Sequence, residues 1–257
     1  MNIVIGIILM AAGVVLYFAR QRSLNNVMNI KYHETSSIAE LLETYQPIQQ
    51  ELGKGNFSQM VELKGVGSSN NPIKAELSGD SVLYYKAEVV RQYEVTVQRT
   101  DDKGNRYTDR ETRYDTVSSN ERFAPILLDD GTGGKIKVDL EGANIIAQKN
   151  LDVFERELRQ GFHISFGGSD SHTIGYKYTE YVIPNNARLY VLGEAADRRG
   201  DLAVIKPAED KNPFIVSTKS EEELIRSNES TALWTMVGAI AAEIGGIGFI
   251  ISYFFQK

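Results

Sequence analysis

The sequence predicts a mainly β soluble domain, either a sandwich or a partly closed barrel, flanked by two transmembrane α-helices. Two observations support this prediction. Long apolar runs occupy residues 3–19 and 232–255, and between them apolar and polar residues alternate with a period of two, as in half-buried strands. Hydrophobic residues make up 42% of the 257 residues, which is enough to build a core.

The composition argues against several kinds of site. A net charge of −6 argues against a nucleic-acid-binding protein, whose electrostatic footprint is a basic patch. The chain contains no Cys, which excludes disulfides, thiolate zinc sites and Cys nucleophiles. Its three His residues lack the i+3 or i+4 spacing that is typical of a His-based metal site. We therefore predict no nucleic-acid partner, no metal and no cofactor.

Residues 3–19 and 232–255 are predicted to be membrane spans. As helices they would be roughly 25 and 36 Å long, against a hydrocarbon core of about 30 Å. The first run is preceded by only Met1 and Asn2 and ends in Tyr17, Phe18 and Ala19. A signal peptide needs a basic n-region and a small-residue cleavage site, so we expect a retained helix instead.

Small residues indicate how the spans pack. Gly238, Ala242 and Gly246 recur at helical spacing in the second span, while Gly6 and Gly13 share one face of the first. Small residues let helix backbones approach closely in lipid. We interpret these five as helix-packing candidates, either between the two spans or between copies of the chain. The alternative is that glycine is simply frequent in membrane helices.

Glu243 is the candidate functional residue inside the membrane, because it is the only charged residue in 232–255. A charged carboxylate at the centre of a span costs about 2.5–3.5 kcal/mol on insertion scales. It lies roughly 120° from the centre of the small-residue stripe. One interpretation is a proton site, an inter-helix hydrogen bond or solute passage through an oligomer. The other is a neutral acid that is tolerated at a helix contact.

Residues 20–58 are predicted to form a stalk that contains one short helix. Ser37 and Glu40 have the spacing of a capping box, and apolar residues repeat every three or four positions from Ile38 to Tyr45. After the β domain, Ser220 and Glu223 repeat the capping-box spacing. They predict a helical linker over 219–231 that leads into the second span.

Residues 59–218 are predicted to form the β-rich domain. The clearest strand covers 83–99, where Arg91 interrupts the apolar series and predicts a bulge. Residues 107–117 return as a charged strand, which predicts a protruding hairpin arm whose charges hinder edge pairing. Shorter strands are predicted at 124–128, 136–140, 151–158, 178–183, 189–192, 202–205 and 214–217.

Two segments suggest a chemical site, and in both the residues favour a loop. The run from Asp129 to Gly134 lacks the Gly-Lys-Ser/Thr ending of a phosphate loop and precedes a strand, so we predict a turn. Asp129 and Asp130 lack the alternating spacing of Ca²⁺ ligands. Residues 169–172 place Ser, Asp and His side by side, but a triad needs convergence in space. We therefore predict no catalytic residue.

The order of these segments resembles the GIDE-domain family, which comprises membrane E3 ubiquitin ligases of mitochondrial and plastid envelopes and their prokaryotic relatives. The resemblance runs from about Val61 to Phe255. It is carried by 63–67, 83–85 with Arg91, 123–128 leading into 129–133, 136–139, 178–184 and 189–194. It implies a membrane-anchored β domain.

The sequence departs from the ligases in one respect that decides its chemistry. In those proteins a zinc-binding RING follows the second span, whereas this sequence ends at Lys257 and has no Cys. The zinc ligands of a RING are thiolates and imidazoles, so we expect no RING, no ligase activity and no enzyme here.

The sequence therefore predicts a non-catalytic, two-span membrane protein at the membrane or envelope. Its GIDE-like β domain would bind a partner, either another protein or a second copy of the chain, beside membrane lipid. One alternative is a ligase-like protein or subunit that acts in protein modification with a separate RING chain. Another is a hydrolase that uses the loop at 169–172.

The two indications about topology disagree. Arg20 and Arg22 follow the first span, and the positive-inside rule then places the soluble domain in the cytoplasm. The family resemblance implies the opposite side, in the periplasm or between two membranes. We favour the side that the resemblance implies.

Overall fold

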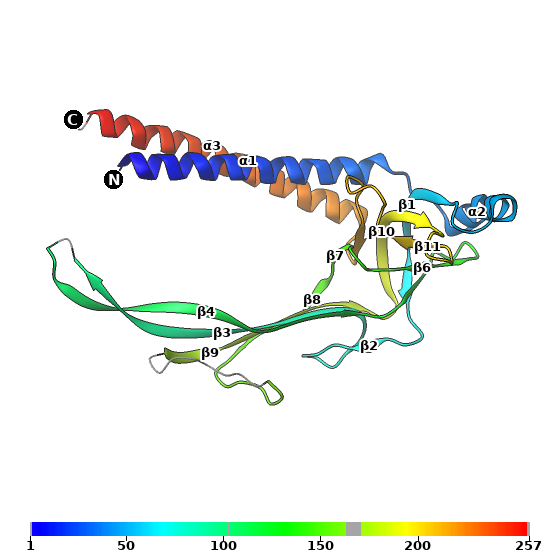
Figure 1. Ribbon diagram of the computed structural model, residues 1–257, viewed down its shortest axis with the longest axis horizontal. Coiled ribbons are helices and arrows are strands. Elements are labelled where there is room, and N and C mark those ends of the chain that lie inside the picture. The colour runs from blue at the N-terminus through cyan, green and yellow to red at the C-terminus, as the bar shows by residue number, and fades with distance from the viewer. Residues whose placement is uncertain (1, 102, 163–170, 256–257) are drawn as a thin grey trace.

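The computed structural model describes residues 2–101, 103–162 and 171–255. Two long helices, α1 (Asn2–Tyr32) and α3 (Glu221–Phe255), lie side by side and extend from a β domain, with both chain ends at their far end (Figure 1). The order of the elements confirms the predicted fold class, a mainly β domain flanked by two apolar helices.

A closed five-stranded barrel forms the centre of the β domain. The ring of pairings runs β1–β5–β6–β11–β10 and closes because β10 also pairs with β1. Two further strands, β12 and β7, continue from β10 beyond the ring. The bounds are β1 (Ser58–Ser68), β5 (Ile126–Asp129), β6 (Lys135–Val138), β7 (Asn144–Ile146), β10 (Ala187–Ala196), β11 (Ala203–Ile205) and β12 (Ile215–Ser217).

The main core lies inside this barrel and beneath the short helix α2 (Ile38–Leu52). The Ser37 side chain accepts a hydrogen bond from the Glu40 N–H, and the Glu40 carboxylate accepts one from the Ser37 N–H, so the predicted capping box is confirmed. Ile38, Leu41 and Tyr45 are buried in the same core as the barrel strands. The predicted stalk helix therefore packs its apolar face on the barrel.

A second sheet of five strands forms a half-barrel beside the first. Its central strand β3 pairs with β2 and β4 on one side and with β9 on the other, and β8 follows β9. The bounds are β2 (Ile73–Lys74), β3 (Ser81–Thr100), β4 (Arg106–Phe123), β8 (Gln148–Glu155) and β9 (Ser171–Pro184). The long strand and the hairpin predicted from the sequence are therefore confirmed.

The outer parts of β3 and β4 form an arm that extends in the same direction as α1 and α3 (Figure 1). Register shifts occur between Val89 and Val90 on the β4 side, and between Gln92 and Tyr93 on the β9 side. The bulge predicted at Arg91 is thus found next to it. Arg91 itself is only 4% exposed, so it continues the buried face of the strand as a polar residue.

Each of the two long helices is continuous from its polar half beside the barrel to its apolar half. Their polar halves are held together by an ion pair of 2.9 Å between Lys31 and Glu229 and by an Asn26–Asn228 hydrogen bond of 3.4 Å. Ile30 of α1 and Leu224 of α3 are buried with barrel residues. By length and composition, both helices are able to cross a membrane.

Candidate functional site

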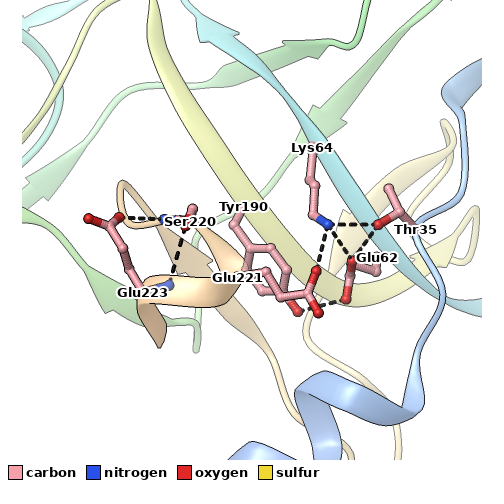
Figure 2. Close-up of polar contacts among 7 residues, drawn as sticks. All are labelled: Thr35, Glu62, Lys64, Tyr190, Ser220, Glu221 and Glu223. Carbon is pink, nitrogen blue, oxygen red and sulfur yellow. Dashed lines mark hydrogen bonds and ion pairs between the residues drawn. The ribbon is translucent and has the colours of Figure 1, made fainter. Parts of the chain in front are cut away.

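A network of polar side chains joins the barrel to the start of α3 (Figure 2). Glu62 on β1 is only 1% exposed, and its carboxylate accepts hydrogen bonds from Tyr190 Oη at 2.8 Å and Thr35 Oγ1 at 2.6 Å. Lys64 Nζ lies 3.2 Å from Glu62 Oε1 and donates to Glu221 Oε2 at 2.6 Å. Three segments far apart in the sequence therefore meet at one buried carboxylate.

Strand geometry explains why these groups converge. Glu62 and Lys64 are two residues apart on β1, so they point to the same face, and Tyr190 on β10 is paired directly with Lys64. The segment after α1 reaches this face through a hydrogen bond of 2.9 Å from the Ser36 N–H to the Glu62 carbonyl. Ser220 and Glu223 exchange the two capping-box hydrogen bonds that begin α3, as predicted (Figure 2).

The electrostatics fit a structural network. Burial raises the pKa of the Tyr190 hydroxyl, and the hydrogen bond to Glu62 raises it further. Burial acts to lower the pKa of the Lys64 ammonium, but its hydrogen bonds to Glu221 and Glu62 raise it overall. Both groups therefore stay protonated at neutral pH, Tyr190 as a donor and Lys64 as a cation. Neither is placed to act as a base.

An open groove of about 790 Å³ lies beside this network, between the end of β1 and the start of α3. The first residues of the loop from Asp129 to Gly134 line it. Asp130 accepts a hydrogen bond of 2.7 Å from the Ile38 N–H, and Thr132 accepts one from Ala39, so the loop caps α2. Burial acts to raise the pKa of the Asp130 carboxyl, but the hydrogen bonds from Ile38 and Thr132 hold it below its usual value. The loop therefore adds to the cap of α2, a role that the turn prediction did not include.

The structure describes two of the four residues at 169–172. Ser169 and Asp170 lie outside the described residues. Ser171 begins β9, and its hydroxyl accepts a hydrogen bond of 3.1 Å from Arg91. His172 lies in a small depression with Glu94 and Arg110. Within 2–101, 103–162 and 171–255 no group of three or more His, Asp or Glu side chains is arranged to hold a metal ion.

The helix-packing candidates lie where α1 and α3 meet. A Cβ placed on Gly6 would lie 2.9 Å from the Gly246 carbonyl oxygen, and one on Gly246 would lie 3.0 Å from the Gly6 oxygen. One on Gly238 would lie 3.2 Å from Leu16 Cδ1. Ala242 is half-buried on α3. The structure therefore brings the small residues of the two helices together within one chain.

Glu243 also lies at this contact, opposite Gly13. A Cβ on Gly13 would overlap the Glu243 carboxylate. Because glycine has no side chain, the carboxylate can occupy this space. Residues 3–19 contain no Lys, Arg, His, Asp or Glu that could pair with Glu243, and the carboxylate lies opposite a glycine. In the sequence, the acid and its glycine are 230 positions apart, and only the pairing of the helices reveals their contact.

The chain matches the model of a known protein family. A family model described as "GIDE: E3 Ubiquitin ligase" matches residues 94–250, which is more than half of the 257 residues. The match begins in β3, contains the arm and most of the barrel, and ends in α3. No curated protein and no solved structure matches the chain.

Proposed function

Because this chain belongs to the GIDE family, described as E3 ubiquitin ligases, we propose that it is a membrane-anchored GIDE domain that binds a protein partner. In this proposal the domain itself performs no chemistry. The 257 residues contain no Cys to hold a RING zinc, and the polar network around the buried Glu62 carboxylate joins structural elements to one another.

The unpaired edge of β4 is the observation that carries the proposal. β4 is 18 residues long and, among the described strands, pairs only with β3. Its outer row of backbone N–H and C=O groups is therefore available to an extended segment of another protein as an added strand. The charges on β4, which hinder pairing with like strands, favour a segment of complementary charge. Two aromatic side chains, Tyr107 and Tyr114, are 48% and 65% exposed on the same strand. Aromatic residues of this kind are enriched in protein interfaces.

Membrane insertion constrains the position of this arm. The arm runs alongside α1 and α3 in Figure 1, yet it carries Asp109, Arg110 and Glu111, which hydrocarbon excludes. When the helices cross a bilayer, the arm must therefore bend away into water. The register shifts at Val89/Val90 and at Gln92/Tyr93 interrupt the sheet on both sides of β3 and are suitable positions for that bend.

The helix pair sets which parts share a side of the membrane. Since α1 and α3 run together to a common end, a crossing pair places both termini on one side and the β domain on the other. We place the β domain in the periplasm or between two membranes, as in the envelope proteins of the family. A cytoplasmic domain is the alternative that Arg20 and Arg22 favour.

Site-specific crosslinking tests whether the arm binds a partner. A photo-crosslinking residue at Tyr107 should capture one defined protein in native membranes, whereas the same residue at Tyr32, which is 84% exposed on α1, should not. The substitution Tyr114→Ala should reduce capture at least tenfold, because exposed aromatic residues at interfaces are frequent hot spots. The free energy of unfolding of the Tyr114→Ala variant should differ from that of the unaltered chain by less than about 0.5 kcal/mol.

The identity of the captured protein distinguishes the two functions. A partner with a RING would favour a ligase-like subunit over a domain that only binds. Equal capture from Tyr107 and Tyr32, or capture that is unchanged by Tyr114→Ala, would contradict the proposed role of the arm.

A further inference from the structure

A groove of about 470 Å³ lies between the apolar halves of α1 and α3. Its walls are almost entirely apolar and include Phe18, Ile240 and Ile247. Glu243 is the one ionisable acid that lines it, and the hydroxyl of Tyr17, which also lines it, accepts a hydrogen bond of 2.9 Å from Gln21. A single carboxylate therefore faces an otherwise apolar groove at the depth of the predicted membrane span.

Gly13 fixes the position of this carboxylate. The glycine leaves a notch in α1 that the Glu243 side chain fills, so the acid lies at the helix contact. Within the part of the chain that the structure describes, no hydrogen bond or ion pair is recorded for its carboxylate. In hydrocarbon, lipid tails offer no donor either, and an unsatisfied acid at this depth is costly.

A second copy of the chain supplies no basic or amide group at this depth. Residues 3–19 contain no Lys, Arg, His, Asn or Gln, and neither do residues 232–255. A second copy would bring another Glu243 and hydroxyl groups such as that of Tyr17. A basic or amide donor for Glu243 must therefore come from a different protein.

We propose that this groove receives a transmembrane helix of another membrane protein, whose basic or amide side chain donates a hydrogen bond to Glu243. The apolar walls pack against the helix, and the carboxylate selects one that carries a donor at the same depth. Intramembrane acids typically face a helix bundle and pair with such groups. The inference rests on the proposed membrane insertion, but it is independent of the arm.

Defined peptides in vesicles test this selection. The full chain is placed in phosphatidylcholine vesicles with Leu-rich transmembrane peptides that carry either Lys or Leu at their centre. Energy transfer from Trp234, the single tryptophan, to a dansyl group on the peptide reports association. The Lys peptide should associate about 5–30-fold more tightly than the Leu peptide. This ratio corresponds to a free-energy difference of about 1–2 kcal/mol between the two peptides. Glu243→Ala should abolish the difference.

A matched control separates recognition in the groove from general attraction to an acid. Combining Glu243→Ala with Ala241→Glu moves the carboxylate only about 3 Å along α3 but to the opposite side of the helix. This variant should not prefer the Lys peptide. Equal binding of both peptides by the unaltered chain, or a preference that persists in the control, would overturn the proposal.

Failure of membrane insertion would be recognised separately. If α1 and α3 do not insert, a protease will degrade them in the same vesicles, whatever peptide is present. That result would contradict the proposed membrane anchoring. Intact, protected helices without a preference for the Lys peptide would contradict only the recognition at Glu243.

Discussion

The substitution Gly246→Leu is expected to force α1 and α3 apart. Even a Cβ at this position would lie 2.9 Å from Met10 Cγ and 3.0 Å from the backbone oxygen of Gly6, so a leucine side chain has no space. Backbone atoms cannot give way as a flexible side chain can, and overpacking of this kind costs about 1–3 kcal/mol. The thermal stability of the full chain in detergent should fall accordingly.

Gly248 provides the matched control for this prediction. It lies two residues further along α3, and a Cβ there would meet nothing within 4 Å. Gly248→Leu should therefore leave stability nearly unchanged. Short thiol crosslinkers between Leu9→Cys and Gly245→Cys, introduced into the Cys-free chain, report the pairing directly. If Gly246→Leu and Gly248→Leu have equal effects, the helices do not pair through Gly6 and Gly246.

The substitution Tyr190→Phe is expected to weaken the junction between the barrel and the long helices α1 and α3. It removes the hydroxyl that donates at 2.8 Å to the Glu62 carboxylate, which is only 1% exposed. A hydrogen bond to a buried charged group contributes about 1.5–3 kcal/mol, and its loss leaves that charge less satisfied. We expect a loss of about 2 kcal/mol in the free energy of unfolding, measured by denaturant titration.

Tyr84→Phe is the control for Tyr190→Phe. Tyr84 is buried to a similar degree and also donates to a carboxylate at 2.8 Å, but its acceptor Glu121 is exposed to water. Water can replace the lost donor there, so the cost should stay below about 1 kcal/mol. Equal costs at the two positions would show that the Glu62 network does not hold the junction together.

Local patterns were sufficient to predict most elements of the β domain. Alternation gave the long strand that became β3, and the charged return strand gave β4. The two capping boxes marked where α2 and α3 begin. These signals depend only on residues that are close together in the sequence, so they can be recognised without knowledge of the fold.

Closure of the barrel and the junction depend on long-range pairing, and the sequence did not reveal them. Barrel closure needs β1 to pair with β10, whose paired residues lie 120 or more positions away, and β6 to pair in parallel with β11. Glu62 and Lys64 look like ordinary charged residues of a strand until that register places Tyr190 and Glu221 beside them.

The candidate residues of the two apolar helices could be identified from the sequence, but their arrangement could not. Helical spacing grouped Gly238, Ala242 and Gly246, yet spacing alone does not tell which helix a face meets. The structure sets Gly246 against Gly6 and Glu243 against Gly13. The groove at Glu243 exists only because the two helices pack side by side.

Topology is the most direct measurement of the central claim, that α1 and α3 cross a membrane as a pair and hold the GIDE domain on one side. Single cysteines replace Asn105 in the arm, Lys211 in the barrel and Lys257 at the end of the sequence. Each variant is treated in intact cells with a membrane-impermeant maleimide. We expect Asn105→Cys and Lys211→Cys to be labelled, and Lys257→Cys only after lysis. Labelling of the three positions from the same side would contradict the account.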